Sequence, residues 1–207
     1  MNNICKDILE VIFDSNNTCY SHKDIIKFCL VCKNIDITLF KKLYLTNINN
    51  INSIDNYIQL KDNCYKIIEL RLIDTNVGDL SFFKLCINMK TLYLKNVDND
   101  NLLNVRYLHN LKYLTLSNMD IYDISFITTT NLKLLTLCYI NISNIEPIQL
   151  CNNLKKMYIK NTYLNNYSHL TKCKSLSKIH IYNSPIHFHD MRYLTENNIK
   201  VYSNIFT

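Results

Sequence analysis

The sequence predicts a repeat solenoid of the α/β class, a curved parallel β-sheet with one strand in each of about seven coils. Two observations predict this fold. An apolar pattern of the form L-x-x-L-x-L recurs along the chain, with starts at Ile67, Met89, Leu111, Leu132, Leu154 and Leu176. Successive starts are separated by 22, 22, 21, 22 and 22 residues, a regular step that indicates a structural repeat.

Each copy of the pattern contains the alternation of a strand with one buried face, as in Leu114, Thr115 and Leu116. One such strand cannot bury its apolar face alone, so we expect successive coils to stack and to share one continuous core. A polar residue follows each strand. We expect its side chain to satisfy backbone groups as a ladder from coil to coil, with Asp74 and Tyr139 replacing an Asn found at Asn47, Asn96, Asn118, Asn161 and Asn183.

The repeat length and the L-x-x-L-x-L signature resemble the leucine-rich-repeat family, in a form with short repeats. Phe40, Leu43 and Leu45 predict an earlier first coil, lengthened by an insertion before Ile67, and residues 199–202 predict a last strand. A repeat of 22 residues leaves little room for a full helix opposite the sheet. We therefore expect short helical turns or extended segments there, as residues 123–127 and 145–148 indicate.

Residues 1–38 do not follow the repeat and predict a helical element ahead of a solenoid domain at residues 39–207. Apolar residues at positions 4, 8, 9, 12 and 13 form a helical stripe, and a second helical stretch follows at residues 24–33. These two stretches resemble the F-box. An F-box followed by leucine-rich repeats is the organisation of the F-box/LRR protein family, although Cys5 and Ile35 stand where the family usually has Pro and Trp.

The F-box resemblance implies docking on the small adaptor subunit of a cullin–RING ubiquitin ligase of the SCF type. The repeats would then hold a substrate for ubiquitination. The residues that this resemblance assigns to adaptor contacts or to helix packing are Ile4, Cys5, Ile8, Leu9, Ile12, Phe13, Ile25, Ile26, Leu30 and Val31. The alternative is an unrelated helical cap over the first coil, since the terminal repeats of a solenoid need a cap.

Composition and charge argue against several classes of protein. The formal charge of +6 permits an acidic partner without requiring a nucleic acid. One Gly and two Pro disfavour Gly-based phosphate loops. Acidic residues interrupt the apolar residues of positions 1–13, and no window of about 18 uncharged apolar residues occurs, so neither a secretory signal nor a membrane span is expected. Nine cysteines then indicate reduced thiols in a cytoplasmic or nuclear protein that is not secreted.

Cysteine spacing favours packing over chemistry. Cys29 and Cys32 form a C-x-x-C pair with no second pair at a compatible spacing, so we interpret them as part of the predicted helix. Cys86, Cys151 and Cys173 each fall nineteen residues after a repeat start and therefore share one place in the coil. We expect them to be small buried wedges between coils, and a reducing compartment argues against a crosslink between the last two.

Catalytic and metal-ligating groups are not expected. His187, His189 and Asp190 follow Pro185 in a segment predicted to be extended, and no third fixed ligand accompanies the two histidines. No nucleophile–base arrangement, carboxylate pair or phosphate loop stands out. The sequence therefore predicts neither an enzyme nor a cofactor or metal site.

The outward positions of the predicted strands should line the concave face of the solenoid, and they are rich in Lys, Arg and Tyr. Tyrosine offers apolar area with a polar tip, a combination common in protein-binding surfaces. We therefore predict a partner-binding surface that comprises Arg71, Tyr93, Lys95, Tyr113, Lys156, Tyr158, Lys160, Lys178, His180 and Tyr182.

The function expected from the sequence is a non-enzymatic adaptor that binds a protein, acidic in character, through its concave face and a ligase adaptor through residues 1–38. One alternative is a plain leucine-rich-repeat binding module with no ligase link. Another is binding of RNA or an anionic surface through the basic face, which would weaken steeply with salt.

Overall fold

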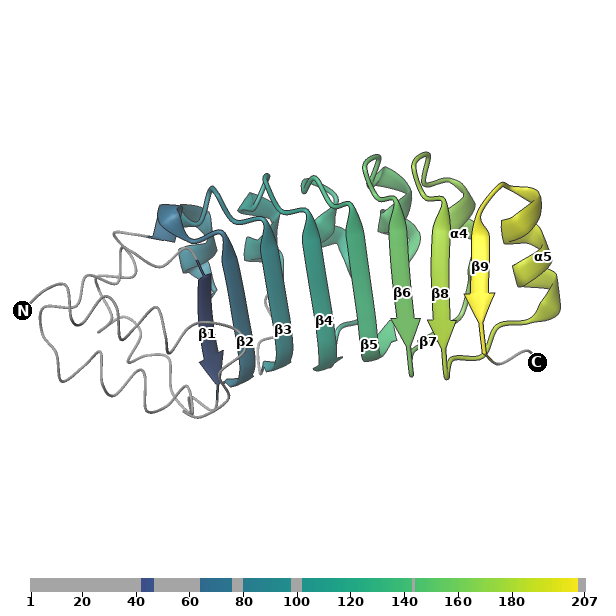
Figure 1. Cartoon of the computed structure of the whole chain (residues 1–207), viewed down its shortest axis with the longest axis horizontal. Helices are drawn as coiled ribbons and strands as arrows, with labels where there is room; N and C mark the ends of the chain where they lie inside the picture. Colours follow the sequence, from purple (N-terminus) through teal and green to yellow (C-terminus); the bar gives the residue numbers. More distant parts are fainter. Residues whose placement is uncertain (1–41, 47–63, 76–79, 98–101, 143, 205–207) are drawn as a thin grey trace, which may run out of the picture.

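A computed structural model describes residues 42–46, 64–75, 80–97, 102–142 and 144–204. Its strands form one parallel sheet in the order β1-β2-β3-β4-β5-β6-β8-β9, and β7 pairs with β5 beside this path. Figure 1 shows the strands side by side with their arrows in one direction, as the sequence predicted. The strands are β1 Lys42–Thr46, β2 Glu69–Thr75, β3 Thr91–Val97, β4 Tyr113–Met119, β5 Leu134–Ile142, β6 Lys156–Lys160, β7 Tyr163–Leu164, β8 Lys178–Tyr182 and β9 Lys200–Ser203.

Each repeat residue pairs with its equivalent in the next coil. Leu92 pairs with Leu114, and Leu94 pairs with Leu116. The inward strand positions therefore form two continuous apolar rows across the sheet, and Leu114 and Leu116 are fully buried, as predicted. These rows form one core with the apolar residues that precede each strand, such as Met89.

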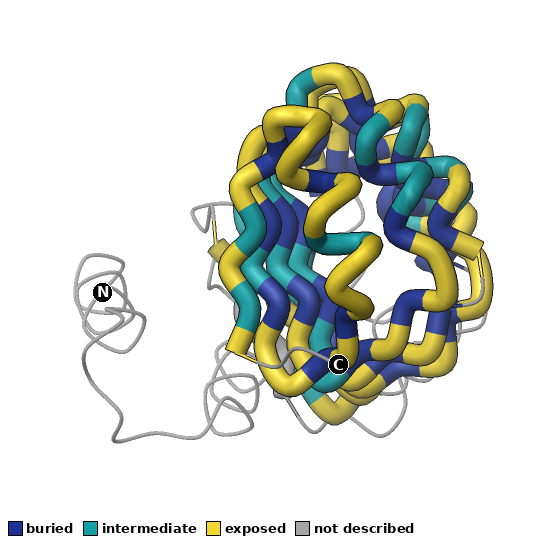
Figure 2. Tube along the Cα trace, turned by 90° about the vertical axis from the view of Figure 1, so that its right-hand side faces the viewer, coloured by how far each residue is buried: buried dark blue, intermediate teal, exposed yellow. Residues whose placement is uncertain are grey.

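Short helical segments cover the opposite side of the core, which confirms the expectation drawn from the short repeat. Figure 2 shows the coils end on, with buried residues lining the interior between the strands and these segments. Each contributes apolar side chains to the core, among them Phe83 and Ile148. The segments are η3 Cys64–Lys66, η4 Ser81–Leu85, η5 Leu102–Tyr107, η6 Ser125–Ile127, η7 Glu146–Leu150, α4 Ser168–Thr171 and α5 Phe188–Glu196. None of these helices has the length and apolar character that spanning a membrane requires.

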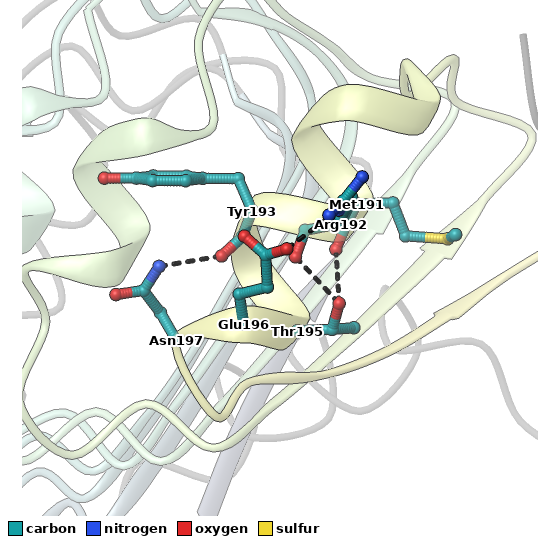
Figure 3. Close-up of polar contacts among 6 residues, drawn as sticks. All are labelled: Met191, Arg192, Tyr193, Thr195, Glu196 and Asn197. Atoms are coloured by element: carbon teal, nitrogen blue, oxygen red, sulfur yellow. Dashed lines mark hydrogen bonds and ion pairs between the residues drawn. The ribbon is translucent and has the colours of Figure 1, made fainter.

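The C-terminal coil corrects one prediction. Residues 187–190 were expected to be extended, but α5 begins at Phe188, and only His187 has extended backbone. The helix forms because Met191 and Leu194 lie three residues apart and so pack on the core from one helix face. The α5 helix also satisfies its own polar groups (Figure 3): Arg192 Nε donates to Glu196 Oε1 at 2.7 Å, and Thr195 Oγ1 donates to the Arg192 carbonyl at 2.8 Å.

The two ends of the solenoid follow the sequence prediction. Strand β1 pairs with β2 and provides the predicted first coil, and β9 provides the predicted last strand one residue later than expected. The helical element predicted for residues 1–38 and the insertion before Ile67 fall outside the described residues, apart from η3 at the end of that insertion.

One residue toward the C-terminal end of each inner strand, within the strand or directly after it, has left-handed backbone. Its φ is positive at Asp74, Asn96, Asn118, Tyr139, Asn161 and Asn183. Asn and Asp tolerate this conformation better than other non-glycine residues, which gives a second reason for their recurrence. The expected ladder exists, and in the inner coils it joins side chains to side chains: Asn118 Nδ2 donates to Asn96 Oδ1, and Asn96 Nδ2 donates to Asp74 Oδ1. In the last coil it also satisfies backbone, because the Asn183 N–H donates to Asn204 Oδ1 at 2.8 Å.

Tyr139 interrupts this ladder because a phenol ring offers no amide oxygen at that position. The Nδ2 atom of Asn161, in the next coil, is buried and has no hydrogen-bond partner among the described residues. In the last coils the ladder resumes, and Asn204 Nδ2 donates to Asn183 Oδ1 at 2.8 Å.

A second set of asparagines, which the sequence reading missed, lies just before the strands. Asn88, Asn110 and Asn131 each donate a side-chain amide to a backbone carbonyl of the preceding coil at 2.7 to 2.9 Å. Asn153 continues the series and donates to Asn131 Oδ1 at 3.0 Å. The two ladders therefore tie the coils together at both ends of the strands.

The cysteines at the shared repeat position are buried between coils, as predicted. Cys86, Cys151 and Cys173 are free thiols, and Cys64 occupies the same position in an earlier coil. Cys173 Sγ donates to the Cys151 carbonyl at 3.2 Å. Burial raises the pKa of Cys151 to about 12 and also raises the pKa of Cys173, so both thiols are protonated at neutral pH.

Candidate protein-binding surface

Three strands at the C-terminal end of the sheet share the sequence Lys-apolar-aromatic, in which the apolar residue packs on the core and the other two face outward. It occurs as Lys156-Met157-Tyr158 on β6, as Lys178-Ile179-His180 on β8 and as Lys200-Val201-Tyr202 on β9. Parallel pairing places the three lysines in one row and the three rings in a second row. The third outward position adds a Lys and a Tyr. We call this surface the basic aromatic site; it comprises Lys156, Tyr158, Lys160, Lys178, His180, Tyr182, Lys200 and Tyr202.

The rings of the site stack on one another. The His180 ring centroid lies 4.7 Å from that of Tyr158 and 4.6 Å from that of Tyr202, with interplanar angles of 24° and 9°. Neighbouring parallel strands are about 4.7–4.9 Å apart, so the register of the sheet is sufficient to bring the rings into contact. Lys156 Nζ lies 4.5 Å from the Tyr158 ring centroid and covers this end of the stack. Both faces of the central ring, His180, are therefore covered by its neighbours in the stack.

One ring nitrogen of His180, Nδ1, lies within hydrogen-bond distance of a tyrosine hydroxyl. Tyr182 Oη lies 3.3 Å from His180 Nδ1. When the hydroxyl donates to Nδ1, the imidazole hydrogen lies on Nε2. Desolvation lowers the pKa of His180, and the charges of Lys156 and Lys178 lower it further, so the ring is neutral at pH 7.

The charge of the site is uncompensated within its own strands. Strands β6, β8 and β9 carry no acidic residue. None of the ion pairs found among the described residues involves the lysines of the site. Lys160, Lys178 and Lys200 are exposed, and Lys156 is half-buried.

The N-terminal half of the face has a different electrostatic character. Glu69 lies 2.8 Å from Arg71 and 3.6 Å from Lys42, so its carboxylate offsets both cations. The Arg71 guanidinium lies 5.9 Å from the Tyr93 ring centroid. Lys95 and Tyr113 lie on the neighbouring strands β3 and β4.

Uncharged side chains separate the two halves. Thr115 and Thr136 pair across β4 and β5 in the middle row of the face. Ser117, at the third of the alternate positions Tyr113, Thr115 and Ser117 of β4, is only 6% exposed, because its small side chain lies between Lys95 and Cys138 of the neighbouring strands.

The structure therefore divides the ten predicted partner-binding residues into two groups. Arg71, Tyr93, Lys95 and Tyr113 lie in the N-terminal half, and the other six lie together in the basic aromatic site. Sequence reasoning missed Lys200 and Tyr202, although the Lys-apolar-aromatic sequence recurs there at the repeat spacing of 22 residues. The ten residues predicted to bind a ligase adaptor, from Ile4 to Val31, lie outside the described residues.

The histidines after Pro185 lie away from this site. His187 and His189 are exposed at the start of α5. Within the described residues, no three His, Cys, Asp or Glu side chains gather as a metal-ligand group.

Comparison with solved structures identifies the architecture. The chain is similar to internalin C2 from Listeria monocytogenes, with a TM-score of 0.59 and 21% identity over 72% of this chain and 74% of that chain. It is also similar to internalin F from the same organism, with a TM-score of 0.53 and 18% identity over 82% of this chain, and it spans 56% of that chain. No family model matches the chain, and no curated protein matches it by sequence. At these identities the likeness concerns the fold, which is the leucine-rich-repeat solenoid.

Proposed function

We propose that this leucine-rich-repeat solenoid is a non-enzymatic binding module that holds a partner protein on the concave face of its sheet. The observation that carries the proposal is the basic aromatic site. It presents cations and tyrosines on paired strands, which fix the spacing of their backbone positions, and stacking holds the Tyr158 and Tyr202 rings against His180. Rings that are already ordered are favourable in a protein interface, since ordering a mobile side chain on binding costs free energy.

A comparison of two matched variants tests which face binds. The concave variant replaces Lys156 and Tyr158 with Ala. The convex control replaces Lys84 and Tyr107, a second Lys–Tyr pair with its Nζ 5.2 Å from the ring centroid. The intact chain and both variants are used to co-purify proteins from the source cells, and melting temperatures establish that both variants fold.

A partner lost with the concave variant and retained with the convex control supports the proposal. If both variants retain every partner, or if only the convex control loses them, the concave face is not the binding surface.

We propose further that residues 1–38 dock on the adaptor subunit of an SCF-type ubiquitin ligase, which would place the protein in the cytoplasm or nucleus. The resemblance of residues 4–13 and 24–33 to the F-box supports this role, as does the position of the repeats directly behind them. In a purified pull-down, Ile8→Asp with Leu9→Asp is expected to abolish adaptor binding. If the intact chain does not bind the adaptor, the ligase role is wrong and the plain binding module remains.

A further inference from the structure

The lysines of the described residues concentrate along one edge of the sheet. Lys90, Lys112, Lys133 and Lys155 each stand directly before a strand, from β3 to β6. The row formed by Lys156, Lys178 and Lys200 at the first strand positions lies beside them. The strands therefore begin at a basic edge, which is densest in the coils of β6, β8 and β9.

Three acidic residues lie toward the opposite edge: Asp74 is near the end of β2, and Asp120 and Asp123 follow β4. Two acids lie toward the basic edge, and both are paired with cations. Glu69 lies at the far end from β9, beside Lys42 and Arg71, and Glu196, at the end of α5 ahead of β9, pairs with Arg192. A negatively charged ligand is consequently attracted to the C-terminal half of the basic edge and repelled from the opposite edge.

We propose that the basic aromatic site binds a carboxylate-rich segment of a partner protein, laid across β6, β8 and β9 so that its Asp and Glu side chains meet the lysine row. The inference rests on the proposed function, because it names the class of partner for the same surface. It adds Lys200 and Tyr202 as binding residues, and it assigns Lys155 to the edge of the bound segment.

The stacked rings favour a peptide over a nucleic acid. Proteins that hold single strands offer free aromatic faces on which bases stack. Here both faces of His180 are covered, by Tyr158 and Tyr202, and Lys156 covers Tyr158. Of the Tyr158 and His180 rings, the edges remain accessible, and they carry a Tyr hydroxyl and the imidazole N–H, which are hydrogen-bond donors. Such donors, beside ammonium groups, suit carboxylates.

The titration of His180 supplies supporting evidence. The groups that face this ring are Lys156, Lys178, Tyr158, Tyr182 and Tyr202. None of them carries a negative charge at neutral pH, and the two lysines oppose protonation of the imidazole. A bound carboxylate reverses this field and raises the pKa of His180. The segment should therefore bind more tightly as the pH falls through the titration range of His180, as long as its own carboxylates stay ionised.

Fluorescence anisotropy with labelled synthetic peptides tests the ligand class on the full chain. The probes are a short Glu-rich peptide and the same peptide with every Glu replaced by Gln. A single-stranded oligothymidylate of equal charge is the third probe. The Glu-rich peptide is expected to bind, to weaken as salt rises and to bind several-fold more tightly near pH 6 than near pH 8. The Gln peptide is expected not to bind.

Two variants of equal charge change locate the binding. Lys178→Glu with Lys200→Glu is expected to weaken the Glu-rich peptide by tenfold or more, about 1.4 kcal/mol. Lys84→Glu with Arg106→Glu makes the same change on η4 and η5 and is expected to leave binding within about twofold. His180→Gln is expected to remove the pH dependence while the peptide still binds.

Each contrary result overturns the inference in a distinguishable way. If the oligothymidylate binds as tightly as the Glu-rich peptide and responds to the same variant, the site recognises anionic polymers and not acidic protein segments. If the Glu-rich peptide does not bind, while the concave variant still loses a partner from cells, the inference fails and the proposed function stands. If no partner depends on the concave face, both fail.

Discussion

At the scale of the residue, the most informative position is the left-handed one toward the C-terminal end of each inner strand. Five coils place Asn or Asp there, and the backbone is left-handed at each of them. Tyr139 adopts the same conformation with φ of 53° and is 56% exposed, so its ring gains little from burial. The Asn161 amide next to it lacks its acceptor. Backbone strain at Tyr139 and an unsatisfied donor at Asn161 therefore occur in neighbouring coils.

Replacing Tyr139 separates the two effects. Tyr139→Gly removes the steric cost of the left-handed backbone, about 1–2 kcal/mol, less the roughly 0.5–1 kcal/mol of entropy that glycine loses on folding. Tyr139→Asn removes much of the same strain and restores an acceptor for Asn161 Nδ2, so it should be the more stable variant by about 1 kcal/mol. Urea unfolding of the three proteins measures both differences. If both variants are less stable than the parent chain, Tyr139 makes a contribution that its exposure does not reveal.

The buried thiols give a second prediction at this scale. A hydrogen bond with Cys64 and burial raise the pKa of Cys86, and burial raises the pKa of Cys151 and Cys173. Alkylating reagents attack the thiolate form. In the native protein at pH 8, iodoacetamide should leave these three residues unmodified, whereas in urea it should modify all of them. Peptide mass spectrometry reads each site separately, and half-buried Cys138 is the internal comparison. Rapid native alkylation of Cys151 would show that the coils open far more readily than their packing indicates.

At the scale of the element, the parallel strand is stable only through its neighbours. Leu116 pairs in register with Leu94 and Leu137 of the flanking strands, and all three are fully buried. Each inward leucine therefore packs against its own equivalents in two other coils. Loss of one side chain leaves a cavity that adjacent coils can fill only by shifting the sheet.

Truncating a buried leucine and an exposed leucine should show that the stability of the fold depends on packing in the core. Leu116→Ala should lower the free energy of unfolding by about 2–5 kcal/mol. Leu150→Ala, in η7, is the matched control because Leu150 is 59% exposed, and it should change stability by less than about 0.5 kcal/mol. Chemical denaturation measures both. Equal effects of the two changes would contradict the assignment of the core.

At the scale of the whole molecule, the solenoid is a one-dimensional stack, so each coil contacts only its neighbours and the ends need protection. At the C-terminal end, α5 covers the last coil and packs against α4 and β9. Leu194 is fully buried beneath this helix, and the surface ion pair of Arg192 with Glu196 lies on its exposed side. The burial of Leu194, and not the ion pair, should hold the cap in place.

Hydrogen exchange tests how far the cap protects the stack. Leu194→Asp places a charge in an apolar site and should detach α5, so that the amides of β9 and then β8 exchange faster while those of β3 and β4 keep their protection. Glu196→Gln should leave the exchange pattern unchanged. A uniform loss of protection in all strands would mean that the solenoid unfolds as one cooperative unit.

The sequence by itself determined the repeat, the strand positions, the buried leucines and cysteines, and the outward rows of the face. The physical reason is repetition: when coils stack in register, the neighbour of each residue is its own equivalent about 22 residues away, so contacts can be read from spacing. Six of the ten residues predicted for the concave face came together in one site by this rule.

Only the tertiary structure decided the contacts at repeat positions where the residues of neighbouring coils differ. The gap at Tyr139 and its effect on Asn161 depend on which atom faces which, and the burial of Ser117 depends on the larger neighbours around it. The ring stack requires side-chain orientations that spacing does not specify. The α5 helix replaced the extended segment because its conformation was set by packing Met191 and Leu194 on the core and not by the repeat pattern.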